Sequence, residues 1–325
     1  MLAALTLSAA ACSNSENEYT GPVEAKITAG LAGAQTRAVD DKWNSDHIGV
    51  MVTNAPNSNM ATLYKNVKYS TTDQSTAANF TAETGKGIFF QDATETVTFA
   101  AYAPYQGSDA NALPGTNSDG IISVSTQENN TSDKQESIDF LYASGATASR
   151  TNPTVSFTNN GSDCSFHHKM ARLDLVLQVS TNDGFTANQI FDDRNLVILD
   201  GLKHDGTFNV TTGEAEVTST SETVNGWHIT SCKHDDINGQ VPGIYTRTYS
   251  LILLPQTRAG ALPLTINIDG QNYKNANSIT PALEAGNVYT YTITVKKTGL
   301  EVGTCTITNW NYGGSQAGDA VMPTN

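Results

Sequence analysis

Few residues of this chain combine the types and spacing that metal or acid–base chemistry needs. Two groups mix cysteine with histidine, as zinc sites do: Cys164, His167 and His168, and His228, Cys232 and His234. Neither group offers four ligands at the close, CxxC-like spacing of a structural zinc site. We therefore interpret both groups as structural or solvated side chains, and we expect neither a metal nor a cofactor.

The pattern of a covalent or phosphoryl-transfer catalyst is also missing. Residues 313–317 (GGSQA) begin like a serine-hydrolase elbow but lack its final glycine, and no helical pattern follows them. The sequence contains no glycine-rich phosphate loop and no EF-hand loop. We therefore expect that the protein is not an enzyme.

The peptide bond between Arg37 and Ala38 is the strongest candidate for cleavage by a protease. It ends a link rich in Gly, Ala and Gln, the kind of mobile, small-residue segment that proteases cut. The same dipeptide recurs at Arg258, so the dipeptide alone does not mark the site. What distinguishes Arg37 is the strand-like segment that precedes it.

That segment, residues 23–31, alternates between apolar and polar positions. The residues on its apolar face are Val23, Ala25, Ile27, Ala29 and Leu31.

 The other face carries Glu24, Lys26, Thr28 and Gly30, opposite Ala29 and its apolar neighbours, which is the period-2 pattern of a half-buried strand. Cleavage after Arg37 removes this strand and leaves an open groove, and an open sheet edge readily accepts a strand from another molecule. The sequence thus predicts a polymer subunit whose chemistry is strand exchange.

Cys12 is a second candidate for modification. Residues 2–11 (LAALTLSAAA) form a short apolar segment that ends in small residues directly before this cysteine, and a polar stretch follows. The arrangement resembles a bacterial lipoprotein signal, with Cys12 as the lipidated first residue after processing. Two departures leave an ordinary cleaved signal with an incidental cysteine as the alternative: no Lys or Arg precedes Cys12, and Ala9 stands where such signals usually carry Leu.

Composition narrows the class of protein. The chain has 325 residues, only 15% of them charged, and a formal net charge of −14. This charge argues against a nucleic-acid partner, which needs a basic surface. Without Cys12, three cysteines remain, an odd number at wide spacing, so free buried thiols are favoured and one pair with a leftover stays open.

Short apolar or alternating runs bounded by turn residues recur along the chain and predict an all-β fold. The runs expected as strands are 23–31, 47–53, 63–69, 87–90, 96–102, 121–125, 140–143, 155–157, 172–179, 196–199, 244–254, 264–268, 288–295 and 304–310. Three pairs predict hairpin turns: Asp205-Gly206, Asn225-Gly226 and Asp269-Gly270. Helical periodicity of useful length is absent, and the number of strands favours two β-sandwiches.

The expected organisation has four parts. Residues 1–12 form the signal and 13–22 a flexible tether. An N-terminal sandwich domain spans 23–163, and a C-terminal one spans 164–325, with a Gly-rich tail from about 311. Residues 159–165 (NNGSDCS) are interpreted as the linker between the two domains.

Several further stretches are informative about the family of the protein because of the order in which they follow one another along the chain. They are Thr36-Arg37-Ala38, Trp43, residues 46–50 (DHIGV), 102–105 (YAPY), 139–143 (DFLYA), 166–173 (FHHKMARL), 254–257 (LPQT), 283–294 (LEAGNVYTYTIT) and 307–310 (ITNW). No single stretch is specific. Together, over nearly the whole chain, they resemble the fimbrillin family, the Mfa-like subunits of type V pili.

The resemblance implies a fold, a location and a mode of assembly. Such proteins are exported as outer-membrane lipoproteins and carry two transthyretin-like β-sandwich domains in tandem. In polymerising members an arginine-specific protease removes the first strand, and a neighbouring subunit fills the groove. Applied to this chain, the resemblance implies that Cys12 carries the lipid. It also implies that the Arg37–Ala38 bond is cut and that residues 23–31 form the strand that is removed.

The resemblance also implies partners, namely other fimbrial subunits, the processing protease and the outer membrane, with adhesion or biofilm formation as the outcome. We expect the donated strand near the C-terminus, with Thr304, Cys305, Thr306, Ile307 and Trp310 as its candidate residues. The tail beyond it stays an alternative donor, and a tip or accessory subunit that accepts without donating stays open. The alternative function is a surface lipoprotein that binds glycan or host protein without polymerising.

Overall fold

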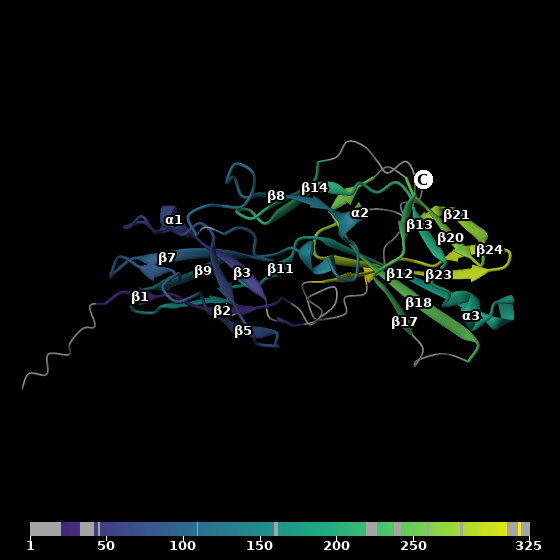
Figure 1. Cartoon of the computed structure of the whole chain (residues 1–325), viewed down its shortest axis with the longest axis horizontal. Coiled ribbons are helices and arrows are strands. Elements are labelled where there is room, and N and C mark those ends of the chain that lie inside the picture. The colour runs from purple at the N-terminus through teal and green to yellow at the C-terminus, as the bar shows by residue number, and fades with distance from the viewer. Residues whose placement is uncertain are drawn as a thin grey trace, which may run out of the picture.

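The computed structural model describes residues 21–32, 42–44, 46–108, 110–158, 162–218, 226–236, 242–258, 260–279, 282–310 and 318–319. Within these ranges the chain is built from β-strands, with three α-helices of one turn each, so the expected all-β class is confirmed (Figure 1). None of these helices has the length and apolar character of a membrane span. We refer to residues up to His168 as the N-terminal half and to the rest as the C-terminal half.

The N-terminal half contains eleven of the described strands. They are β1 (Val23–Glu24), β2 (Lys26–Gly30), β3 (His47–Asn54), β4 (Val67–Ser70), β5 (Ala77–Phe80), β6 (Phe89–Phe90), β7 (Thr96–Ala103), β8 (Ile121–Ser125), β9 (Leu141–Ser149), β10 (Thr154–Phe157) and β11 (His167–His168). The helical turns of this half are α1 (Met60–Leu63), α2 (Thr126–Asn129) and the 3-10 turn Gln135–Ser137.

The C-terminal half continues in the same manner. Its described strands are β12 (Ala171–Ser180), β13 (Leu196–Leu199), β14 (Asp205–Asn209), β15 (Glu214–Val217), β16 (Trp227–Ile229), β17 (Lys233–Asp236), β18 (Ile244–Leu253), β19 (Gln256–Thr257), β20 (Leu262–Ile268), β21 (Gln271–Ile279), β22 (Ala282–Leu283), β23 (Asn287–Lys296), β24 (Gly299–Val302), β25 (Thr306–Asn309) and β26 (Gly318–Asp319). Its helical turns are the 3-10 turn Thr181–Asp183 and α3 (Ala187–Ile190).

Each half encloses a hydrophobic core between sheets. In the N-terminal half a five-stranded sheet, β11-β9-β7-β3-β4, and a three-stranded sheet, β10-β2-β5, contribute side chains to one cluster. In the C-terminal half the sheet β17-β18-β12-β23-β25-β26 and the sheet β16-β13-β20-β21 share another cluster. Strand β12 alternates between buried and half-buried residues, so one of its faces covers that core. The side chains of this face include Leu173, Leu175, Leu177 and Val179.

The two halves are joined by more than the covalent chain. Strand β8 of the N-terminal half pairs with β14 of the C-terminal half over five residues, from Asp205↔Ser125 to Asn209↔Ile121, and β15 continues that sheet. A third hydrophobic cluster includes Tyr102 and Phe140 from one half and Phe208 and Trp310 from the other. The halves therefore share both a sheet and a core.

Two local predictions are wrong. Residues 63–69 do not form one strand, because α1 extends to Leu63 and buries Met60, and β4 begins only at Val67. Asp205-Gly206 is not a turn but the start of β14, where an added Cβ on Gly206 would lie 2.1 Å from the carbonyl oxygen of Glu216. Glycine at position 206 thus allows β15 to approach closely, and it does not form a turn.

One hairpin prediction is confirmed. Asp269 and Gly270 have φ of 53° and 79° and connect β20 to β21, with Ile268 opposite Gln271. Positive φ at both central residues is the requirement of a tight two-residue hairpin turn. Asn225 lies outside the described residues.

Candidate functional site

The segment expected to leave the protein occupies the middle of a sheet. Strand β2 pairs in parallel with β10, from Thr154↔Lys26 to Phe157↔Ala29. On its other side it pairs antiparallel with β5, from Ile27↔Phe80 to Gly30↔Ala77. Just ahead of it, β1 pairs with β6 through Val23↔Phe90 and Glu24↔Phe89. The predicted single strand 23–31 is therefore observed as two consecutive strands, β1 and β2, with Ala25 between them.

The apolar face of this segment fills the N-terminal core. Ala25, Ile27, Ala29 and Leu31 are each at most 9% exposed and belong to the same cluster, and Val23 packs against its rim. The alternation read from the sequence is thus confirmed. Because successive side chains of a strand point to opposite faces, a one-residue shift would bring polar side chains into this core and so fixes the register.

Trp43 closes the core over the strand. Its ring is fully buried and lies edge-on to Phe80 at 5.1 Å and to Phe166 at 5.2 Å between ring centroids. Its indole N–H donates a hydrogen bond to the carbonyl of Ala29 at 3.1 Å. Trp43 therefore holds β2 both by packing and by a polar contact.

The end of the segment is tied to the boundary between the halves. The N–H of Phe166 donates to the carbonyl of Gly30, and the N–H of Ala32 donates to the carbonyl of Phe166, each at 2.9 Å. Leu31 forms a parallel bridge with Phe166. The residue at the start of the FHHKMARL stretch thus receives the end of the first strand, a partnership that the sequence did not indicate.

Removal of residues 23–31 would leave a defined groove. The facing edges of β10 and β5 would lose their hydrogen-bond partners, and the core would lose four buried side chains. A buried backbone group without a partner is costly, so such a groove favours occupation by another strand. A strand that alternates small and medium apolar residues would fit the vacated positions.

The predicted donor residues lie in the sheet of their own half. Strand β25 pairs with β23 over four residues and with β26 over two. Cys305 and Ile307 are half-buried against the C-terminal core, and Thr304 is exposed just before the strand. The donor role of this segment stays a prediction, and it requires β25 to change partners.

Trp310 marks the end of that segment and reaches the other half. Its ring is 1% exposed and stacks on the imidazole of His168, with centroids 3.7 Å apart and planes 7° apart. His168 Nδ1 lies 2.7 Å from a carboxylate oxygen of Asp139, and both side chains are buried. His168 therefore has a structural environment, and the buried carboxylate orients its ring.

The remaining residues singled out from the sequence take separate positions. Cys12, Arg37 and Ala38 lie outside the described residues. His167 lies 3.1 Å from a carboxylate oxygen of Asp163. In the part of the chain that the structure describes, no three His, Cys, Asp or Glu side chains gather as metal ligands.

The three described cysteines are free and half-buried: Cys164, Cys232 and Cys305. Burial raises the pKa of each thiol, that of Cys232 to about 11. A raised pKa keeps a thiol protonated at neutral pH and so makes it a poor nucleophile. Cys164 and Cys305 pack as small apolar side chains at the margins of the two cores.

Comparison with known proteins gives consistent matches over most of the chain. A fimbrillin-like family model matches residues 36–310. A protein of Bacteroides uniformis named as fimbrium subunit Fim1C is 27% identical over 320 residues, which cover 94% of this chain and 92% of that protein.

Solved structures share the fold. A protein of Bacteroides ovatus described as a cell adhesion protein has a TM-score of 0.69 and 28% identity, over 89% of this chain and 98% of that one. A fimbrial protein from Bacteroides vulgatus has a TM-score of 0.53 and 16% identity, over 89% of this chain and all of that one.

Proposed function

This chain belongs to the fimbrillin-like family, and from this premise we propose that it is a fimbrial structural subunit assembled by protease-triggered strand exchange. Cleavage after Arg37 releases residues 23–31, and a strand of a neighbouring subunit takes their place. The role is structural and adhesive, without catalysis. The observation that supports it best is the position of β2, which is central in its sheet and yet is the first strand of the core.

The energetics are adequate for a durable polymer. A donated strand would form backbone hydrogen bonds with β10 and β5 and place alternate side chains where Ala25, Ile27, Ala29 and Leu31 now lie. Burial of four or five such side chains contributes roughly 5–10 kcal/mol by area, from which the cost of ordering the donor is subtracted. Replacement of one strand by another conserves most of these interactions.

We further propose the organisation and location that accompany this role. Residues 23–163 and 164–325 form two transthyretin-like β-sandwich domains, and the protein is exported as a lipoprotein anchored through Cys12. It then becomes part of a fimbrium at the cell surface. Its partners are other fimbrial subunits and an arginine-specific protease.

The donor is the segment of β25, with Thr304, Cys305, Thr306, Ile307 and Trp310. Cys305 and Ile307 present a half-buried apolar face, which suits a groove that accepts alternate side chains. Ile307→Asp should block polymerisation without affecting cleavage, whereas Thr306→Asp, on the exposed face, should polymerise normally. Normal polymers from Ile307→Asp would place the donor elsewhere, with the tail beyond Trp310 as the alternative.

The decisive experiment is limited digestion of the purified, unlipidated protein with an arginine-specific protease. We expect a single new N-terminus at Ala38, followed by detergent-resistant ladders on gels and fibres in electron micrographs. Arg37→Lys should abolish the cut and the ladders. Arg258→Lys, at the second Arg-Ala pair, is the matched control and should change neither.

Other outcomes would contradict parts of the proposal. Cleavage at Ala38 without polymers would make the protein a tip or accessory subunit. Resistance of Arg37 to the protease, with a protein that stays monomeric, would mean that the first strand is permanent. In that case the non-polymerising surface binding protein becomes the better assignment.

A further inference from the structure

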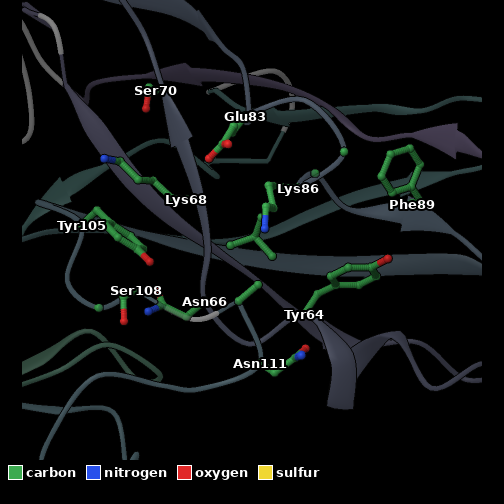
Figure 2. A pocket seen from close by; sticks show the side chains of 15 residues that line it. Tyr64, Asn66, Lys68, Ser70, Glu83, Lys86, Phe89, Tyr105, Ser108 and Asn111 are labelled. Atoms are coloured by element: carbon green, nitrogen blue, oxygen red, sulfur yellow. The ribbon is translucent and has the colours of Figure 1, made fainter.

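A cavity of about 950 Å³ opens on the N-terminal half, and none of its lining residues belongs to the first strand (Figure 2). Its walls come from three segments: strand β4 with the residues just before it, the loop 83–89 that leads into β6, and residues 105–108 and 110–111 after β7. Its size is in the range of small-molecule and cofactor sites, which are about 300–1,000 Å³.

Residues 105–108 and 110–111 are held by a buried amide. Asn66 is fully buried, its Nδ2 donates to the carbonyl of Gln106 at 2.7 Å, and its Oδ1 accepts from the hydroxyl of Tyr102 at 2.8 Å. The backbone N–H of Asn66 also donates to the carbonyl of Ala110 at 3.1 Å. Gly107 has φ of 107°, and an added Cβ would lie 2.7 Å from Asn66 Nδ2. This wall is therefore fixed before any ligand arrives.

The loop 83–89 is fixed in a similar way from behind. The N–H of Ile88 donates to the hydroxyl of Tyr69 at 2.9 Å, and its carbonyl accepts from the N–H of Ala25 at 2.8 Å. Gly87 lies against the side chain of Glu24, with no room for a Cβ. Preformed walls reduce the entropy lost when a ligand binds.

The lining combines flat apolar rings with polar groups of both kinds. Tyr64, Phe89 and Tyr105 are half-buried, and Lys68 Nζ lies over the Tyr105 ring, 5.7 Å from its centroid. Figure 2 shows Tyr105 and Lys68 on one side of the cavity, Tyr64 and Phe89 on the other, and Lys86 between them.

Hydrogen-bonding groups complete this lining. Lys68 and Lys86 supply donors, Glu83 supplies acceptors, and all three are exposed. Asn111 and Ser108 add an amide and a hydroxyl.

We propose that this cavity is a saccharide-binding site. A pyranose ring has an apolar face of C–H groups that packs on aromatic rings, and a rim of hydroxyls, each of which both donates and accepts hydrogen bonds. Three aromatic rings together with lysine, carboxylate and amide groups match both parts of such a ligand. A purely apolar ligand would use none of these hydrogen-bonding groups, whereas the hydroxyls of a saccharide can pair with lysine, carboxylate and amide groups alike.

The test uses the purified, labelled protein on a microarray of neutral and acidic oligosaccharides, followed by calorimetric titration with the oligosaccharide that binds most strongly. The double variant Glu83→Gln, Lys86→Ala changes two exposed lining residues. The matched control is Glu136→Gln, Lys134→Ala, another exposed pair far from the cavity in the sequence. Tyr105→Phe keeps the ring of Tyr105, and Tyr105→Ala removes it.

The expected result is binding by the wild type, by the Glu136/Lys134 control and by Tyr105→Phe. The Glu83/Lys86 variant and Tyr105→Ala should each bind about tenfold more weakly or worse, the loss expected when hydrogen bonds to charged groups or a stacking surface disappear. The proposal is overturned if no oligosaccharide on the array is bound. It is equally overturned if the cavity variants bind as well as the control. Neither result depends on whether the protein polymerises.

Discussion

The indole N–H of Trp43 donates to the carbonyl of Ala29 across the point where the chain is expected to be cut. Ala29 belongs to the strand that would leave, and Trp43 belongs to the part that would stay. Both residues are fully buried, so the bond is shielded from water. The incoming strand must therefore bring a carbonyl to the same place, or the indole N–H loses its partner.

Trp43→Phe should loosen the first strand while keeping an aromatic ring in the core. We expect the free energy of unfolding to fall by about 1 kcal/mol or somewhat more, because a buried hydrogen bond and part of a ring are lost. Hydrogen exchange of residues 25–31, followed by mass spectrometry, should become faster. Trp227→Phe, at a buried tryptophan of the C-terminal core, is the control and should leave the exchange of residues 25–31 unchanged.

Ile27→Ala should destabilise the precursor strongly. Ile27 is 2% exposed between β5 and β10, and truncation of such a side chain typically costs about 2–5 kcal/mol. Lys26→Ala, at the exposed neighbouring position, should stay within about 0.5 kcal/mol of the wild type. Urea denaturation measures both changes, and equal effects would mean that the strand is not held by its buried face.

Removal of the first strand should loosen one wall of the saccharide cavity. Ala25 donates to Ile88, and β1 pairs with Phe89 and Phe90, so the loop 83–89 loses its support when β1 and β2 leave. In protein cleaved at Arg37 but not yet polymerised, amide exchange should rise in residues 86–91. A peptide of residues 23–32 should restore protection there, and exchange in β13 should not change. An unaltered loop after cleavage would show that the wall is independent of the strand.

Acid should weaken the junction between the halves through His204. This residue is 5% exposed, its Nδ1 lies 3.0 Å from Thr126 Oγ1, and burial lowers its pKa to about 4. An unfolded histidine binds its proton near pH 6.5, so the unfolded state takes up more protons as the pH falls from about 6.5 to about 4. Stability is therefore lost over that range, by roughly 3 kcal/mol in total for this group.

The His204→Gln variant isolates this effect. Unfolding measured in urea at pH 7.5 and pH 4.5 should show a smaller loss for the variant than for the wild type, because other groups titrate in both. An identical loss of stability in the two proteins would mean that folding does not lower the pKa of His204.

The sequence predicted the strands whose alternation is strong and whose one face is buried. Residues 23–31 and 172–179 are examples, because period-2 alternation directly encodes which side meets the core. Strand β21 was not predicted, since Gln271–Ile279 is a polar strand at the edge of its sheet and carries little hydrophobic pattern. The first two residues of β14, Asp205 and Gly206, were mistaken for a turn because an Asp-Gly pair is a strong signal of a hairpin turn.

The candidate sites show the same limit. The sequence order showed which face of the first strand is buried. It did not show that this strand pairs with β5 and β10. The contact with Phe166 joins residues more than 130 positions apart, and it follows from tertiary packing alone. The saccharide cavity likewise gathers three segments, each of which looks like an ordinary loop or strand when it is read separately.

The ladder between β8 and β14 has a mechanical consequence. Figure 1 shows both strands running along the long axis of the molecule, with the N-terminal half at one end and the C-terminal half at the other. A pulling force along that axis loads the five residue pairs in shear, so that their hydrogen bonds must yield together and not one after another. Such a joint resists sudden tension better than a ladder that opens like a zipper. In a polymer under tension along this axis, the joint between the halves would be loaded in its stronger direction.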